Sequence, residues 1–268
     1  MFDTLLHKSL RIPYALHVHV DQKPKRPRAT VVLLHGIGDS AATWDKLVAE
    51  LPSDVRIISI DLLGFGKSPA PSWLTYNIRV QARSVMTTLL GRRIRRPLII
   101  VGHSMGSLVA IEMARRYSLL VNSLVLCSPP LYSDEQRRRL LPNPNRMLKS
   151  IYRLMVDNPK RVVDVSSFVD RLKIAGSAFH ITADNVTIFM SALEAAIIDQ
   201  TALSDMRAIQ KPIRLIHGRL DPLVIKANLR DVVDANPHAT LEVVNASHEL
   251  NRGYITAVTK AVVELQAG

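Results

Sequence analysis

The sequence contains a single cysteine and no long hydrophobic run. With Cys127 alone, the chain can form no intramolecular disulfide bond and no zinc site built from cysteines. No stretch approaches the roughly 18 consecutive apolar residues that a membrane-spanning helix requires. The first twenty residues include Asp3, Lys8, Arg11 and Pro13, so they lack the uninterrupted apolar segment of a signal peptide. These absences make the cytoplasm the expected location.

Aromatic and acidic residues are also few. Phe, Trp and Tyr make up 5% of the chain, and 23 acidic residues stand against 35 lysines and arginines, for a formal net charge of +12. A field of this sign attracts polyanions and anionic membrane surfaces. The basic runs are not interleaved with aromatic residues as in a base-stacking groove, so we expect no specific nucleic-acid partner and at most a weak attraction to anionic membranes. These runs, interpreted as solvated loop and helix ends, lie at 23–28, 92–96 and 137–139.

The remaining composition is that of an ordinary globular protein, with 47% hydrophobic and 22% charged residues. A chain of 268 residues is long enough to bury a substantial core. Length alone allows one large α/β domain with an insertion, or two smaller domains.

Strand-like and helix-like segments alternate along most of the chain. Short apolar runs are typical of strands that are buried on both faces of a parallel sheet, and apolar residues spaced three and four apart indicate helices. This alternation predicts a doubly covered, mostly parallel sheet. The expected strands are 16–20, 30–35, 55–60, 97–102, 123–127, 213–217 and 240–244, and the expected helices are 42–51, 76–90, 105–117, 224–235 and 254–266.

The alternation is interrupted between residue 130 and residue 202. No convincing buried strand occurs in this interval, and helical segments dominate it, separated by prolines. The simplest organisation is one α/β domain formed by residues 1–129 and 203–268, with residues 130–202 inserted as a helical unit. The helices expected within the insertion are 134–141, 147–156, 161–171 and 186–198.

The strongest local signal is Gly102-His103-Ser104-Met105-Gly106, which matches G-x-S-x-G directly after an apolar strand and directly before a helix. On such a sharp turn the serine hydroxyl stands clear of the sheet. The residues two positions away on each side must be small, because a side chain there would collide with the turn. The following helix directs unpaired N–H groups toward the space above the serine, which favours developing negative charge. Ser104 is therefore the candidate nucleophile, and a glycine-rich turn that serves only close packing is the alternative.

A serine hydroxyl needs a base to take its proton and a third group to orient that base. Among nine histidines, His248 follows the strand 240–244, at the sheet edge where Ser104 is expected. Asp221 follows the strand 213–217 at the same edge, and the order Ser104, Asp221, His248 is the one expected on this kind of sheet. The residues interpreted instead as structural or surface residues are His35, His103, His180, His217, His238, Asp199, Asp205, Asp231 and Asp234.

An acyl-transfer site also needs hydrogen-bond donors for the oxyanion that forms on the substrate. One donor is expected to be the backbone N–H of Met105, the residue after the candidate nucleophile. The second is assigned to the N–H of Ile37, in a glycine-containing loop where the main chain can approach the substrate. A simple turn between a strand and a helix is the alternative interpretation of that loop.

Together these features closely resemble the α/β-hydrolase superfamily over nearly the whole chain. The resemblance implies a mostly parallel, doubly wound sheet of the α/β-hydrolase type, with a helical cap inserted after the sixth strand. It also implies that the cap covers the pocket and sets substrate choice, and that residues 61–68 shape a loop beside the site. Ser247 departs from the family, which commonly has a glycine before the histidine. The matching segments, in the family's order, are 35–38, 61–68, 102–106, 218–221 and His248.

The serine at position 104 narrows the reaction class. Haloalkane dehalogenases and epoxide hydrolases of this fold use an aspartate there, so Ser104 argues against both. The preferred interpretation is a hydrolase that cleaves a carboxylic ester or thioester through a Ser-His-Asp triad and an acyl-enzyme, with no metal and no cofactor. Enzymes that cleave carbon–carbon bonds in ring-fission products are an alternative, although their base is typically followed by tryptophan and His248 is followed by Glu249.

Two other classes stay open. One is an acylglycerol or phosphatidyl lipase that binds an anionic membrane. The other is a receptor or scaffold, although such members often have a damaged triad and all three positions are filled here. Packing between helices is the commoner role of apolar residues in the insertion. The candidates for an acyl pocket are Met147, Met155, Phe168, Phe179, Phe189 and Met190.

Overall fold

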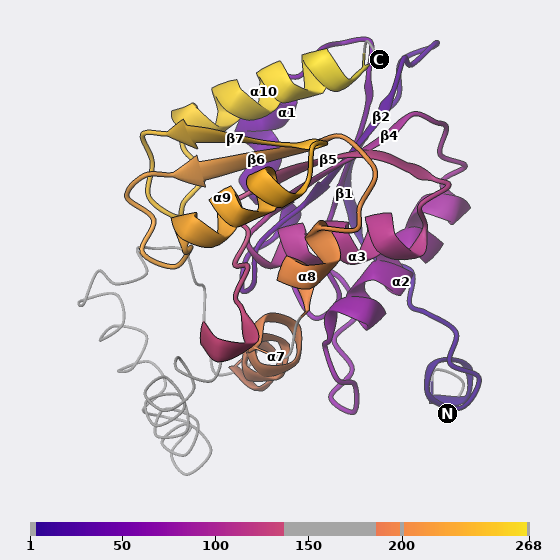
Figure 1. The fold of residues 1–268 in the computed structure, drawn as a ribbon. Coiled ribbons are helices and arrows are strands. Elements are labelled where there is room, and N and C mark those ends of the chain that lie inside the picture. Colours follow the sequence, from indigo (N-terminus) through magenta and orange to yellow (C-terminus); the bar gives the residue numbers. More distant parts are fainter. Residues whose placement is uncertain (1–3, 137–185, 199–200, 267–268) are drawn as a thin grey trace.

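The computed structural model describes residues 4–136, 186–198 and 201–266, and a seven-stranded sheet lies at its centre (Figure 1). The strand order is β1-β3-β2-β4-β5-β6-β7. Every neighbouring pair is parallel except β1 and β3, which are antiparallel. The strands are β1 (Val18–Gln22), β2 (Thr30–Leu34), β3 (Arg56–Ile60), β4 (Leu98–His103), β5 (Val121–Cys127), β6 (Ile213–Gly218) and β7 (Ala239–Val244).

The central strands are apolar because both of their faces are covered. Every residue of β2, β3 and β4 is buried. Strands with helices on both sides have no face left for polar residues, so they consist of nearly continuous apolar runs. The predicted doubly wound, mostly parallel sheet is confirmed.

Helices form the two covering layers (Figure 1). One layer contains Trp44 and Ile255 in its core, and the other contains Leu89 and Leu229. The first layer consists of the 3-10 turn η2 (Ala41–Trp44), α1 (Asp45–Val48) and α10 (Arg252–Gln266). The second consists of α2 (Ile78–Gly91), α3 (Met105–Arg116), α8 (Ala202–Met206) and α9 (Lys226–Ala235). A short π-helical segment, η1 (Thr4–Ser9), precedes the sheet.

All seven predicted strands are found, with ends that shift by one or two residues. The predicted helix 42–51 is wrong in length, since a 3-10 turn is followed by only four α-helical residues, Asp45–Val48. Pro52 limits this segment, because the residue before a proline avoids the helical conformation. The helix predicted from residue 76 begins at Ile78, where the side chain of Asn77 accepts a hydrogen bond from the N–H of Val80 at 2.9 Å.

The insertion point differs from the prediction in one respect. The cap was expected after the sixth strand, whereas β5, the strand that precedes residue 130, is the fifth along the described chain. Only one strand, β1, precedes β2 in the described chain. Residues 11–17 join no ladder, and Pro13 among them has no N–H to donate to one.

The sheet is continuous across the insertion. Strands β5 and β6 are paired in parallel, with Leu124 opposite Ile213. The last predicted helix, 186–198, is present as α7 (Val186–Ala192) and the π-helical η4 (Leu193–Ile198). The helices predicted at 147–156 and 161–171, and all but the start of 134–141, lie outside the described residues, as do Met147, Met155, Phe168 and Phe179. In the described ranges, no helix has the length and apolar character needed to cross a membrane.

Candidate active site

Ser104 occupies a strained turn between β4 and α3. Its backbone has φ 51° and ψ −119°, a conformation that residues with a side chain rarely adopt. The Ser104 N–H donates to the carbonyl of Cys127 at 2.9 Å, and the Ser107 hydroxyl donates to the carbonyl of Gly102 at 2.8 Å. These two contacts hold the turn, so the position of the Ser104 side chain is determined by the surrounding sheet and helix.

The two glycines of the motif are required by close packing. A Cβ atom on Gly102 would overlap the carbonyl of Gly106, and one on Gly106 would overlap the carbonyl of Leu34. The sequence-based expectation that small residues are needed there is therefore met. The contact with Leu34 also places the start of α3 against the end of β2.

Asp221 and His248 form a buried pair at the carboxyl edge of the sheet. The Nδ1 atom of His248 lies 2.8 Å from Oδ2 of Asp221, and the side chains are 6% and 0% exposed. Burial acts to raise the pKa of Asp221. The hydrogen bond and charge of His248, a hydrogen bond from Ser128 and one from the Leu223 N–H outweigh it and hold the pKa below its usual value. Because a carboxylate only accepts hydrogen bonds, Nδ1 carries a proton, and in the neutral ring Nε2 therefore has the lone pair.

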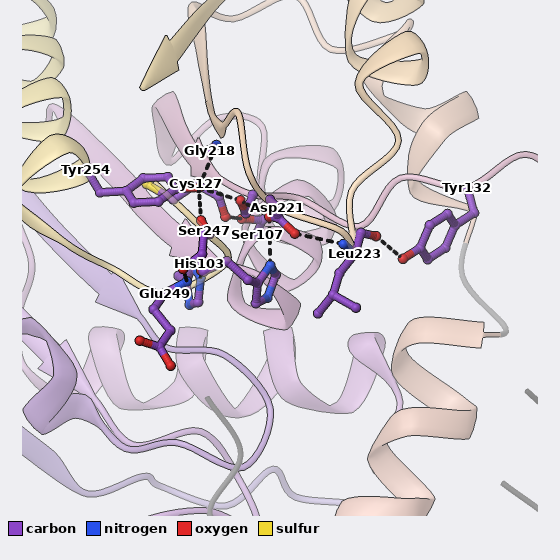
Figure 2. A network of polar contacts seen from close by, with 12 residues as sticks. His103, Ser107, Cys127, Tyr132, Gly218, Asp221, Leu223, Ser247, Glu249 and Tyr254 are labelled. Atoms are coloured by element: carbon purple, nitrogen blue, oxygen red, sulfur yellow. Dashed lines mark hydrogen bonds and ion pairs between the residues drawn. The ribbon is translucent and has the colours of Figure 1, made fainter. Parts of the chain in front are cut away.

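Ser128 and Tyr254, which the sequence analysis did not select, complete the surroundings of this carboxylate; Figure 2 labels Tyr254, Gly218 and Asp221. The Ser128 hydroxyl donates to Oδ2 of Asp221, the same oxygen that accepts from His248. The hydroxyl of Tyr254 lies 2.6 Å from Ser128 Oγ and accepts from the Gly218 N–H at 2.8 Å. Since the Ser128 proton points at Asp221, the Tyr254 hydroxyl donates to Ser128, and the carbonyl of Ser247 is a second, longer acceptor at 3.4 Å. A continuous chain of hydrogen bonds thus runs from the backbone of β6 to the carboxylate.

The position of Ser128 gave a weak signal in the sequence, because it directly follows β5 at the edge where Asp221 and His248 lie. The position of Tyr254 gave no signal, because Tyr254 is one of several residues on the apolar face of α10.

His103 connects the turn of Ser104 to the loop of His248. Its Nε2 lies 2.8 Å from the carbonyl of His248, and the two imidazole rings are 5.0 Å apart between centroids. Burial is the largest cause that lowers the pKa of His103, to about 3, so the ring is neutral at ordinary pH. The carbonyl requires a donor, so Nε2 carries the proton. His103 therefore anchors the backbone of His248 and does not act as a base.

The predicted oxyanion loop lies against the turn of Ser104. A Cβ atom on Gly36 would lie 3.3 Å from Cβ of Ser104 and 3.2 Å from Nδ1 of His103. The N–H groups of Ile37 and Met105 donate to no other described residue. Two backbone donors therefore stand unused beside Ser104, which is the arrangement that an oxyanion requires.

Ser104 and His248 are both 5% exposed, yet no hydrogen bond joins them. Nε2 of His248 is buried and has no hydrogen-bond partner among the described residues. The structure thus brings Asp221 and His248 into contact and places Ser104 next to His103, which contacts His248.

The other histidine and aspartate near the site have structural contacts. Nε2 of His35 accepts from the N–H of Leu62 at 2.8 Å, and burial lowers the pKa of His35. Asp61 accepts from the N–H groups of Ala41 and Lys67 at 2.7 and 2.8 Å. The described residues include no group of three or more His, Cys, Asp or Glu side chains arranged to hold a metal ion.

Comparison with known proteins agrees with the fold. A model of the alpha/beta hydrolase family matches residues 31–257. The probable lysophospholipase BODYGUARD 3 of Arabidopsis thaliana is 35% identical over 106 residues, which are 38% of this chain and 21% of that protein. BODYGUARD 4 of the same plant is 32% identical over 125 residues, 44% of this chain and 30% of that protein. The matched segments therefore span less than a third of these relatives.

Solved structures resemble nearly the whole of this chain, a longer stretch than the sequence relatives match. The enol-lactonase of Burkholderia xenovorans has a TM-score of 0.70 at 22% identity, covering 94% of this chain and 96% of that one. An esterase of Exiguobacterium antarcticum has a TM-score of 0.72 at 16% identity, covering 96% and 100%. At these identities the likeness shows the fold. With the family model matching most of its length, the chain belongs to the alpha/beta hydrolase family.

Proposed function

We propose that the protein is a serine hydrolase that cleaves a carboxylic ester or thioester through an acyl-enzyme. Ser104 is the nucleophile, His248 is the base, and Asp221 orients the base. One observation carries the proposal: the buried His248–Asp221 pair lies at the sheet edge where Ser104 is held with φ 51°. A strained serine at the same sheet edge as an imidazole oriented by a carboxylate is the arrangement needed to make a hydroxyl nucleophilic.

In the first half of the reaction, the Oγ of Ser104 attacks the acyl carbon while Nε2 of His248 takes its proton. Catalytic hydrogen bonds are often long in the absence of substrate, and the missing Ser104–His248 bond forms when the substrate fills the site. The carbonyl oxygen becomes an oxyanion that the N–H groups of Ile37 and Met105 stabilise. The imidazolium of His248, steadied by Asp221, then protonates the leaving alcohol or thiol as the bond to the acyl carbon breaks.

The second half repeats these steps with water. His248 takes a proton from water, and the resulting hydroxide attacks the acyl carbon of the Ser104 ester. The second tetrahedral intermediate collapses, Ser104 recovers its proton from His248, and the carboxylic acid leaves. In the net reaction, one ester or thioester and one water molecule give one carboxylic acid and one alcohol or thiol.

Residues 130–202 act in this proposal as a cap that selects the acyl group. Two contacts of the described ends of this segment support the assignment. The Tyr132 hydroxyl donates to the carbonyl of Leu223, whose N–H donates to Asp221 (Figure 2). At the other end, Phe189 of α7 is buried with the core residues of the α2–α3 layer. The first end thus contacts the loop of Asp221, and the second packs into the core of the domain.

The test combines covalent labelling with hydrolysis of p-nitrophenyl butyrate. A fluorophosphonate should label Ser104, as located by mass spectrometry, and Ser104→Ala should abolish both labelling and turnover. Ser53→Ala changes an exposed serine on a distant turn and serves as the matched control, which should keep both. Labelling of another serine, or turnover that survives in Ser104→Ala, would overturn the proposal.

Lysophospholipids are a second candidate class of substrate. The observation in their favour is the identity of 28 to 35% to five Arabidopsis proteins named probable lysophospholipases. Release of fatty acid from palmitoyl lysophosphatidylcholine, measured beside p-nitrophenyl butyrate, tests it. Turnover of the soluble ester without release of palmitate would reject this candidate and leave the hydrolase proposal intact.

A further inference from the structure

Two basic runs that are far apart in the sequence meet at the amino edge of the sheet. Residues 23–28 lead into β2 and residues 92–96 lead into β4, and these strands are parallel neighbours, with Thr30 opposite Leu98. Parallel strands begin at the same edge, so their approach segments lie side by side. We call the exposed side chains of these two runs, together with Leu90 and Leu119, the amino-edge patch.

Hydrogen bonds join the strand starts into which the two runs lead. The Thr30 hydroxyl donates to the carbonyl of Arg95 at 2.8 Å, and the Thr30 N–H donates to the carbonyl of Pro97 at 2.9 Å. On the next strand, the side chain of Asn122 in β5 accepts from the Leu98 N–H at 3.0 Å. The patch therefore extends across the starts of three neighbouring strands as one surface.

The charge of the patch is far from balanced. The two runs contain eight exposed cations, and the acidic residues paired with them are Asp21, 3.2 Å from Arg92, and Asp54, 3.1 Å from Arg28. A second arginine, the buried Arg56, also binds Asp21 at 2.9 Å. The cations of the patch that form no ion pair with a described residue are Lys23, Lys25, Arg26, Arg93, Arg95 and Arg96.

Exposed leucines accompany this charge. Leu90, two residues before Arg92, is 57% exposed, and Leu119, three residues before Asn122, is 81% exposed. Exposed leucines and unpaired cations at the same edge of the sheet have the composition of a membrane-binding surface. On such a surface the cations meet lipid phosphates and the apolar side chains enter the acyl boundary.

We propose that the amino-edge patch docks the protein on a bilayer that contains anionic phospholipids. A nucleic acid would also bind the cations. The two runs, however, contain no aromatic residue on which a base could stack, and a nucleic acid would give the exposed leucines no role. The patch lies at the opposite edge of the sheet from Ser104, which follows the carboxyl end of β4. Docking therefore leaves the candidate active site facing away from the membrane, and the proposal does not depend on the proposed function.

The test is co-sedimentation of the full chain with vesicles of phosphatidylcholine, with and without phosphatidylglycerol. The patch variant Lys25→Gln/Arg93→Gln is compared with the control Lys46→Gln/Arg230→Gln, which removes the same two charges from exposed sites on α1 and α9. Each cation lost from the patch should weaken binding to the anionic vesicles by about fivefold. The control should bind like the wild type, and Leu119→Ser should weaken binding with no change in charge.

Each alternative outcome has a clear meaning. Equal weakening in the patch variant and the control would show that net charge alone drives binding, and would overturn the proposal. The proposal also fails if the wild type binds poly(U) RNA but not the anionic vesicles, or if it binds neither. Thermal unfolding of each variant confirms that any loss of binding comes from a folded protein.

Discussion

The hydroxyl of Ser128 and the imidazole of His248 donate to the same oxygen of Asp221. This arrangement leaves one carboxylate oxygen with two side-chain donors, while Oδ1 accepts from the Leu223 N–H at 2.8 Å. A carboxylate with three donors stays ionised at low pH and has little freedom to rotate. In the proposed mechanism, Ser128 therefore acts through Asp221 as a positioning residue, and Tyr254 acts through Ser128.

Loss of the Ser128 hydroxyl should affect the pH dependence of turnover. In Ser128→Ala the ionised carboxylate loses a donor worth about 1.5–3 kcal/mol, so kcat should fall by about tenfold. Without the Ser128 hydrogen bond the pKa of Asp221 should rise, and the acid limb of the kcat profile should move to higher pH. The measurement is p-nitrophenyl butyrate hydrolysis across pH, with Ser53→Ala as control. A lower kcat with an unshifted acid limb would contradict this role.

Tyr254 should contribute mainly to stability. Tyr254→Phe keeps the buried ring but leaves the N–H of Gly218 without its partner at 2.8 Å, a loss of about 1–3 kcal/mol in the free energy of unfolding. Urea denaturation measures this directly. Tyr117→Phe is the matched control, because its hydroxyl makes no hydrogen bond to a described residue. If both variants were equally stable, the hydrogen-bond chain to Ser128 would have no energetic role.

The backbone strain at Ser104 predicts that a glycine at this position gives a more stable protein than an alanine. Ser104→Gly removes the side chain that disfavours φ 51°, whereas Ser104→Ala retains a Cβ atom there. The glycine variant should therefore unfold with a free energy about 1 kcal/mol higher than the alanine variant. Both lack the hydroxyl, so activity does not enter the comparison. Equal denaturation midpoints would argue against strain at this turn.

His103 should make the protein sensitive to mild acid. Its pKa is lowered to about 3 in the folded chain, while the ordinary value is 6.5, so the unfolded chain binds a proton that the folded one does not. The contribution of His103 to the free energy of unfolding is fully present above pH 6.5. It falls by about 1.4 kcal/mol for each pH unit as the pH drops toward 3. His103→Gln, which can still donate to the His248 carbonyl, should flatten this dependence.

Unfolding in urea at several pH values between neutral and mildly acidic measures the effect. The wild type and His103→Gln should differ in slope, not only in overall stability. Parallel pH dependences would show that another group binds the proton.

Several parts of the site could be predicted from the sequence because they depend on local geometry. Ser104 follows an apolar strand and precedes a helix, so its neighbours alone determine the turn. Asp221 and His248 each follow a parallel strand, and parallel strands end at one edge of the sheet. Placing both residues at the same edge therefore required only that the strands be recognised. The structure adds that their side chains meet at 2.8 Å.

The sequence alone determined the doubly wound sheet. Strands that are buried on two faces must be continuously apolar, and the helices that cover them must be amphipathic, so both leave a pattern along the chain. Contacts between side chains were decided only by tertiary packing. Tyr254 reaches Ser128 across 126 residues because of how α10 lies on the sheet, and the basic runs 23–28 and 92–96 meet because β2 and β4 are neighbours. Helix orientation and strand order come from the whole core, and no local pattern in the sequence records them.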